Sequence, residues 1–357
     1  MKQGILYRVT QGPFRYQAWP TVCRDEAGTI YVAFSGHRVS HVCPFGKNLL
    51  LISRDNGQSW TPPMIVNDTW LDDRDAGLCD LGGGKLLLTY FNHPAEFYYR
   101  DRRQSVTKRT DSFTHDMTMG LVDQLPSLTE EQNRYGSFLR ISPDGGMSWG
   151  EPIQVPVTAP HGPIKTREGK LLYLGKEFHS SLEEKNFIHL LESDDDGQTW
   201  QVRATLDCPE DYGASCLYEP HLAQLPDGTL FGAIRGENVP SDGHVTMFFT
   251  RSKDGGATWS RPTPSGICGA PPHFLVLSDG RLLCTFSRRE DPCGIRAIIS
   301  DDGGETFGEE ITLFTSPSSD LGYPSTVELD DHTLLTVYYG RVGDDTRTSI
   351  LYTKWSV

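Results

Sequence analysis

The chain has 357 residues and a formal net charge of −14. This acidic balance excludes the broad basic surface by which proteins bind nucleic acid. No run of 18 apolar residues occurs, so no membrane-spanning helix is expected, and the opening MKQGILYRVTQGPF contains no apolar signal segment. We therefore expect a cytoplasmic protein without membrane partners, or a secreted one if a signal segment has been removed.

Six units of similar pattern follow one another along the chain. Each contains two apolar strands joined by a tight turn, then a third strand and, in the first five units, an octapeptide with a short fourth strand behind it. Four antiparallel strands repeated radially predict an all-β fold, a six-bladed β-propeller, which we expect to be a single domain over residues 1–357. The units begin at Ala18, Arg74, Ala159, Leu217, Ala270 and Leu321.

The octapeptides share Ser, an Asp two residues later, Gly, and a final Trp or Phe. Asp side chains bond nearby backbone amides and Gly adopts positive φ, so the pattern is typical of a tight hairpin turn. We interpret it as a structural staple on the rim; a metal or substrate site is the alternative. The copies are SRDNGQSW (53–60), SPDGGMSW (142–149), SDDDGQTW (193–200), SKDGGATW (252–259) and SDDGGETF (300–307).

Two places depart from the repeat. The sixth unit lacks an octapeptide and a fourth strand, so we expect the N-terminal segment GILYRV (4–9) to close blade 6. Blade 2 carries an insertion at about 93–136, which we expect to cover the channel mouth or to pack on a partner subunit in a homo-oligomer. A mobile surface excursion is the alternative. Arg100, Arg102 and Arg103 of the insertion could add positive charge to the site.

The first strands of propeller blades line the central channel, so the residues at their starts should meet at one mouth. Polar side chains occupy this place in five of the six units, which indicates a site; mutual hydrogen bonding around a wet channel is the alternative. The converging residues are Ala18, Trp19 and Pro20, then Asp73, Arg74 and Asp75, then His161, then Glu219 and His221, then His273, and finally Tyr323.

The octapeptide S-x-D-x-G-x-x-W/F closely resembles the Asp box of the sialidase (neuraminidase) superfamily. The resemblance implies the propeller fold and, more weakly, glycoside hydrolysis, since one fold hosts many activities. LYEPHLAQLPDGTLFGAIR, GIRAIIS and LGYPSTVEL match the family's catalytic Glu, two of its arginines and its Tyr. By this resemblance Tyr323 is the nucleophile and Glu219 its base, while Arg235 and Arg296 bind a substrate carboxylate. His161 in APHGP loosely matches a glycine-rich turn of the family.

Two family features are missing. QAWP places Ala18 where the family has its first arginine, which Arg38 or Arg74 could replace. The loop SGHRVSHVCPFGK after the first hairpin contains no carboxylate, so another group must act as the acid. Asp75 is our preferred candidate, with Asp73 and His41 as alternatives. Further substrate-binding candidates are Trp19, His41, His161, His221 and His273.

These features predict an exo-glycoside hydrolase that removes a terminal acidic, sialic acid-like sugar from a carbohydrate substrate. The eight cysteines form no CxxC pair, and we expect neither a metal nor a cofactor. The alternatives are a glycosidase for a neutral or uronic sugar, a lyase that uses Tyr323 with His161 or His221, and a carbohydrate-binding propeller without turnover.

Overall fold

The computed structural model describes residues 1–108, 111–237 and 246–357. Its strands form six antiparallel sheets in which consecutive strands are neighbours, so the predicted six-bladed propeller is confirmed. The inner strands of neighbouring blades contact one another around the central channel. Among the described residues, no helix has the length and apolarity needed to cross a membrane.

The strand bounds are given blade by blade, from the channel outward. Blades 1 and 2 consist of β2 (Tyr16–Arg24), β3 (Ile30–Arg38), β4 (Lys47–Ser53) and β5 (Met64–Asn67), and of β6 (Arg74–Gly82), β7 (Lys85–Asn92), β8 (Gly136–Ser142) and β9 (Ile153–Val155). Blade 3 consists of β10 (Val157–Thr158) and β11 (Ile164–Lys165), which both pair with β12 (Leu171–Glu177), and of β13 (Ile188–Ser193) and β14 (Gln201–Thr205).

The remaining blades are regular. Blade 4 follows the short helix η3 (Ala214–Cys216) and consists of β15 (Leu217–Gln224), β16 (Leu230–Gly236), β17 (Thr246–Ser252) and β18 (Thr263–Cys268). Blades 5 and 6 consist of β19 (His273–Val276), β20 (Leu282–Arg288), β21 (Gly294–Ser300) and β22 (Ile311–Thr315), and of β23 (Gly322–Glu328), β24 (Leu334–Arg341), β25 (Thr348–Trp355) and β1 (Lys2–Tyr7).

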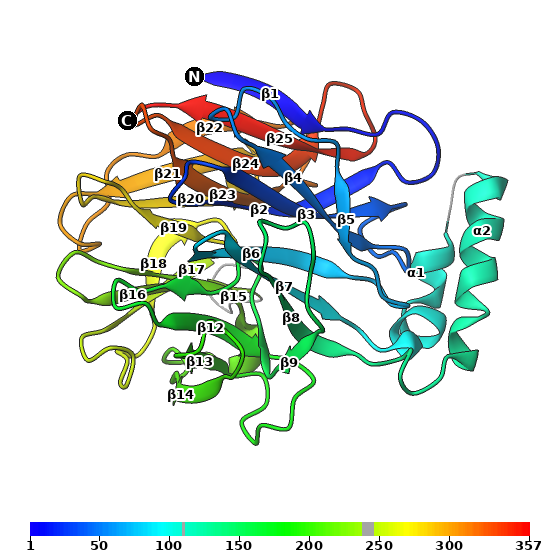
Figure 1. Cartoon of the computed structure of the whole chain (residues 1–357), viewed down its shortest axis with the longest axis horizontal. Helices are drawn as coiled ribbons and strands as arrows, with labels where there is room; N and C mark the ends of the chain where they lie inside the picture. The colour runs from blue at the N-terminus through cyan, green and yellow to red at the C-terminus, as the bar shows by residue number, and fades with distance from the viewer. Residues whose placement is uncertain (109–110, 238–245) are drawn as a thin grey trace.

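The N-terminal strand closes the ring as expected. β1 pairs antiparallel with β25, so the first and last strands of the chain share one sheet. The two termini accordingly lie close together in Figure 1. This pairing covers the edge that blade 6 would otherwise expose.

The hydrophobic core is divided among the blade junctions. Six clusters of buried Leu, Val, Ile and aromatic side chains each lie between two neighbouring blades, including one between blades 6 and 1. Successive side chains of a strand point to opposite faces of the sheet, so apolar side chains cover both faces of a blade and each sheet packs on two neighbours. The rigid ring that results holds the starts of the inner strands together at one mouth.

The octapeptides make the contacts of a hairpin staple. Asp55 accepts hydrogen bonds from the Ser53 hydroxyl at 2.8 Å and from the Ser59 amide at 2.8 Å. The same two contacts recur in the other four copies. These carboxylates are therefore committed to their own turns.

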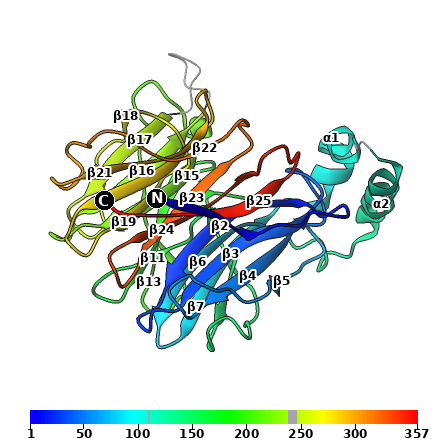
Figure 2. The same cartoon turned by 90° about the horizontal axis from the view of Figure 1, so that it is seen from above.

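The blade 2 insertion forms a small helical unit at the edge of the ring (Figures 1 and 2). A cluster that includes Tyr98, Val106 and Val122 packs it against Leu71. Residues 109–110 lie outside the described residues. The unit contains η1 (Phe97–Asp101), α1 (Arg103–Thr107), α2 (Ser112–Val122) and η2 (Leu125–Ser127).

Candidate active site

Four blades present a side chain at the channel mouth through the same irregularity of the inner strand. The pairing with the next strand shifts register at each of these places. In three of them the sequence is WP, EP or YP, and proline has no N–H to donate to the ladder. A bulge of this kind changes the direction in which a side chain points. Here it also places a residue other than glycine in the left-handed backbone region, which destabilises the fold by about 1–3 kcal/mol per residue. The residues and their φ values are Trp19 (51°), Asp75 (52°), Glu219 (44°) and Tyr323 (54°).

Tyr323 and Glu219, which are 104 residues apart in sequence, meet in a hydrogen bond. The Tyr323 hydroxyl donates to one oxygen of Glu219, and the other oxygen accepts from Arg235 Nη1 at 2.5 Å. Burial, followed by the charges of Glu219 and Asp75, raises the pKa of Tyr323 well above its ordinary value. The phenol is therefore neutral at rest, with a carboxylate placed to accept its proton.

A second arginine at this site, Arg289, was missed by the sequence reasoning. Its guanidinium carbon lies 5.7 Å from the centroid of the Tyr323 ring, and its Nε donates to the Leu321 carbonyl at 3.1 Å. Arg289 follows β20 two residues beyond the repeat position of Arg235, so alignment of the units did not reveal it. Arg289 could have been found in the sequence by comparing the arginines that follow each hairpin.

Arg296, which we expected here, lies elsewhere. It is buried in β21, and its Nη atoms donate to the carbonyls of Pro292 at 2.7 Å and Phe314 at 3.0 Å. These contacts hold blade 5 together. The expectation that Arg296 binds the substrate carboxylate is therefore wrong in this structure, because its donors are used by backbone oxygens away from Tyr323.

Asp75 has the properties of a buried acid. Burial is the largest cause that raises its pKa to about 7; the charge of Arg74 opposes the rise and that of Glu219 adds to it. Among the residues that the structure describes, its Oδ1 has no hydrogen-bond partner. Below about pH 7 the carboxyl is mostly protonated and can donate a proton.

Asp73 does not reach the mouth, although the sequence placed it beside Asp75. Its carboxylate accepts from Asn92 Nδ2 at 2.7 Å and from the Thr69 amide at 2.9 Å. The residue is fully buried, and its pKa is also raised to about 7 by burial. These hydrogen bonds hold the link before β6 in place. They use both carboxylate oxygens of Asp73, so neither is free for a substrate.

Trp19 fills the blade 1 sector of the mouth. The guanidinium carbons of Arg38 and Arg74 lie 4.6 and 4.2 Å from its ring centroid. Arg38 is fully buried and binds both oxygens of Asp72, so it cannot replace the missing family arginine. Arg74 Nη1 lies 3.4 Å from the carbonyl of His41 and keeps donors for other partners.

His41 is neutral and cannot serve as the acid. Desolvation, and after it the charges of Arg74 and Arg38, lowers its pKa to about 2. Its Nδ1 lies 3.1 Å from the Tyr16 hydroxyl, which donates its only hydrogen to Asp320 at 2.8 Å. Nδ1 therefore carries the imidazole proton, and Nε2 is an acceptor.

The three other predicted histidines lie against one another in the channel, and His161 is next to Tyr323. The His221 and His273 rings stack with centroids 4.7 Å apart, and the centroid of His161 lies 5.0 Å from that of His273. All three are buried, and burial lowers the pKa of His221 to about 3. The backbone amide of Phe274 donates to His221 Nδ1 at 3.0 Å. His221 and His273 are thus held by packing in the channel, whereas His161 Nε2 has no hydrogen-bond partner among the described residues.

A cavity of about 310 Å³ opens beside Asp75 and Glu219, between blades 2 and 3. Its aromatic wall comes from the ends of β7 and β12, which the sequence reasoning did not consider. The Lys176 ammonium lies 3.5 Å from the centroid of the Tyr218 ring, and burial lowers the pKa of Lys176 to about 8. The side chains that line the cavity include Phe91, His93, Lys176, Phe178 and Tyr218.

The blade 2 insertion contributes His93 to the lining of this cavity and supports it with Phe97. Phe97 stacks on His93 with the ring centroids 4.0 Å apart. We expected the arginines of the insertion to add positive charge to the site, and Arg102 does so at the cavity: after burial and the charges of Arg74 and His179, its charge lowers the pKa of His93. Arg100 and Arg103 form ion pairs within the insertion, and Arg102 lies over Phe97.

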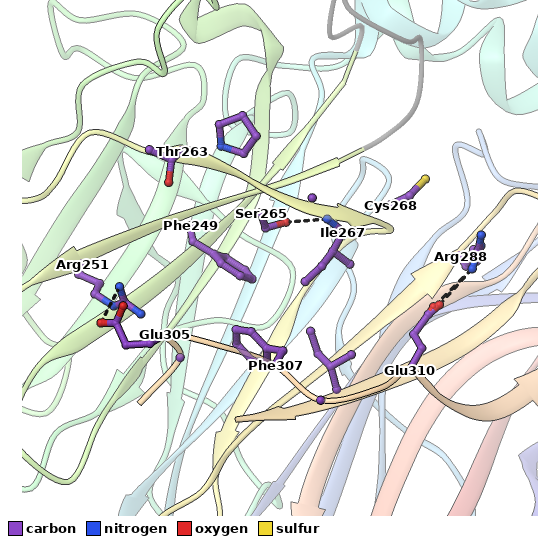
Figure 3. A pocket seen from close by; sticks show the side chains of 15 residues that line it. Phe249, Arg251, Thr263, Ser265, Ile267, Cys268, Arg288, Glu305, Phe307 and Glu310 are labelled. Atoms are coloured by element: carbon purple, nitrogen blue, oxygen red, sulfur yellow. Dashed lines mark hydrogen bonds and ion pairs between the residues drawn. The ribbon is translucent and has the colours of Figure 1, made fainter. Parts of the chain in front are cut away.

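A larger hollow lies between blades 4 and 5, lined by residues of β17, β18, β20 and β21 and by the octapeptide of blade 5. Figure 3 shows its lining. It measures about 640 Å³ and contains Phe307, which stands where the other four octapeptides have Trp. Its charged side chains are already paired, Arg251 with Glu305 and Arg288 with Glu310, each at 3.1 Å. Within the described ranges, no group of three His, Cys, Asp or Glu residues is arranged to hold a metal ion.

Comparisons with known proteins agree with this architecture. The chain is similar over 99% of its length to a protein of unknown function from Dyadobacter fermentans, with 24% identity, a TM-score of 0.78 and 98% of that chain covered. The intramolecular trans-sialidase from Ruminococcus gnavus is 14% identical, with a TM-score of 0.63 and 99% and 97% of the two chains covered. The NanB sialidase from Streptococcus pneumoniae is 13% identical, with a TM-score of 0.69 and 99% and 70% covered.

A search of curated proteins finds no match. Residues 126–337 match the family model described as the BNR repeat-like domain, which is more than half of the chain. The chain therefore belongs to the BNR repeat-like family and has the six-bladed β-propeller fold of the sialidase superfamily.

Proposed function

We propose that the protein is an exo-glycoside hydrolase for a terminal sugar that carries a carboxylate at its anomeric carbon, as sialic acids do. The observation that carries this proposal is the hydrogen bond from Tyr323 to Glu219 at the channel mouth, with Arg235 and Arg289 beside it. The propeller fold and the BNR repeats are consistent with a glycoside hydrolase.

A tyrosine suits such a substrate because it is neutral until it reacts. An aspartate or glutamate nucleophile would be repelled by the substrate carboxylate, whereas a phenol is not. Only a base can make the phenol reactive, since its pKa is raised. Glu219 therefore takes the Tyr323 proton as the phenolic oxygen attacks the anomeric carbon.

The leaving group departs with a proton from Asp75. The bond from the anomeric carbon to the leaving oxygen breaks as the bond to Tyr323 forms, which gives a glycosyl-tyrosine intermediate. A water molecule then attacks the same carbon, Asp75 accepts a proton from that water, and Glu219 returns the phenolic proton. General acid–base catalysis of this type contributes about 10²–10⁴ to a rate.

The two arginines hold the substrate carboxylate and balance the charge near the phenolate. Arg235 uses two of its N–H groups for Glu219 and Glu237, which leaves others for a ligand. Arg289 donates from Nε to a carbonyl and from Nη2 to the Tyr339 hydroxyl at 3.4 Å, which leaves further N–H groups beside Tyr323 for a ligand. A hydrogen bond to a charged group contributes about 1.5–3 kcal/mol.

A panel of aryl glycosides tests the proposal, with sialic, uronic and neutral sugars side by side. We expect release of the aryl group from the sialoside and loss of this activity in Tyr323→Phe and Glu219→Ala. Tyr338→Phe is the matched control, because that hydroxyl is buried against Thr353 in the outer part of blade 6. An enzyme that cleaves only the neutral glycosides, or that stays active as Tyr323→Phe, would contradict the proposal.

A further inference from the structure

Trp70 is an unusual tryptophan in this chain. Its side chain is 56% exposed, whereas Trp19 and Trp355 are buried and the four octapeptide tryptophans are half-buried. It lies in the link between β5 and β6 and borders two hollows, of about 380 and 470 Å³. An exposed indole beside a hollow offers a flat apolar face together with one N–H donor.

The larger hollow has an aromatic wall and a polar rim. Tyr90 and Phe138, whose rings stack with centroids 5.5 Å apart, lie behind Trp70. Arg134 lies over the Phe138 ring at 5.1 Å. The other polar side chains of the rim include Glu131, Gln132 and Glu151.

The charges on this rim are not committed to one another. In the part of the chain that the structure describes, no ion pair involves Glu131, Arg134 or Glu151. The rim hollow between blades 4 and 5 differs, because its arginines and glutamates pair with each other. The carboxylates and the guanidinium beside Trp70 thus remain available to a ligand, whereas Gln132 Oε1 accepts a hydrogen bond from the Thr129 amide at 2.9 Å.

We propose that the hollow beside Trp70 binds a neutral pyranose. The indole offers a flat apolar face for the C–H side of a sugar ring, and the carboxylates, the amide and the guanidinium can bond its hydroxyls. The rim carries two carboxylates and one guanidinium, so its net negative charge disfavours the binding of an anionic sugar. The volume of about 470 Å³ falls within the range of small-molecule sites.

This site is separate from the catalytic one and does not depend on turnover. The link that carries Trp70 leads directly into β6, and Asp75 lies at the start of that strand. A glycan with several sugar units could therefore occupy both sites, and the second contact would raise its affinity by effective concentration.

The test is a titration of the full-length protein with lactose, maltose and cellobiose, followed by calorimetry and tryptophan fluorescence. We expect at least one of these neutral disaccharides to bind, and Trp70→Ala to weaken its binding by about tenfold or more. Phe113→Ala is the matched control, since Phe113 is 67% exposed and lines neither hollow. Arg134→Ala is a second variant, which leaves the Trp70 link intact and should also weaken binding.

Hydrolysis of aryl glycosides separates this proposal from the proposed function. Trp70→Ala should leave the hydrolysis of a small aryl glycoside unchanged, whether or not binding of the disaccharides is lost. No saturable binding of any of the three disaccharides, or equal affinity in wild type and Trp70→Ala, would overturn the proposal. Dissociation of a dimer by Trp70→Ala in sedimentation would also overturn it, because the hollow would then be a contact between copies of the chain.

Discussion

Replacement of Asp75 by Asn tests the assignment of the general acid. The carboxyl has a pKa of about 7, so wild-type kcat/KM should fall about tenfold per pH unit above that value as the acid deprotonates. An amide has nearly the same shape but cannot transfer a proton. Asp75→Asn should therefore lose the alkaline limb of the profile and about 10²–10⁴ of the rate with a poor leaving group.

The leaving group makes this assay specific. A sialoside with an acidic phenol as leaving group needs little help from an acid, whereas an alkyl sialoside needs a full proton transfer. We expect Asp75→Asn to slow the alkyl substrate much more than the aryl substrate. Equal losses with both substrates, or a wild-type pH profile in the variant, would refute the reasoning.

The same substitution has an opposite effect on stability. A carboxyl whose pKa rises from 3.8 to about 7 on folding opposes folding once the pH exceeds 3.8, and the cost is complete above about 7. The shift corresponds to at most about 4 kcal/mol, so Asp75→Asn should unfold at higher denaturant concentration than wild type at pH 8. Asp73→Asn is the matched control: its pKa is also about 7, but it should lose hydrogen bonds from Thr69 and Asn92 and keep the alkaline limb.

Three further predictions follow from the placement of side chains. Arg289→Ala should raise KM for an acidic aryl glycoside by about tenfold or more, whereas Arg296→Ala should lower thermal stability and leave KM unchanged; the reverse pattern would contradict the assignment. Deletion of residues 1–10 removes β1 and exposes the edge of β25, so Tm should fall by about 10 °C or more, and an unchanged Tm would show that the closure is dispensable. Phe97→Ala removes the ring stacked on His93 and should raise KM with little change in kcat; kinetics identical to wild type would separate the insertion from the site.

The repeated pattern of the sequence was sufficient for most of the fold. Strand pairing within a blade is local, and each octapeptide satisfies its own turn, so these features can be recognised without the rest of the chain. The closure of blade 6 by the N-terminal strand could be predicted because the sixth unit of the sequence lacks a fourth strand. The meeting of Tyr323, Glu219 and Arg235 at the mouth could be predicted because these residues occupy comparable places in the repeat or match a family motif.

The remainder of the site was decided by the tertiary structure. Asp73 and Asp75 are two residues apart, yet only the bulge in β6 determines which of them faces the channel. Arg289 and Arg296 differ in where their guanidinium groups lie. Arg289 comes just after β20, beside Tyr323, whereas Arg296 donates its hydrogen bonds to carbonyls of blade 5. The protonation of Asp75 and His41 depends on burial and on charges from distant blades, and these become neighbours only when the ring closes.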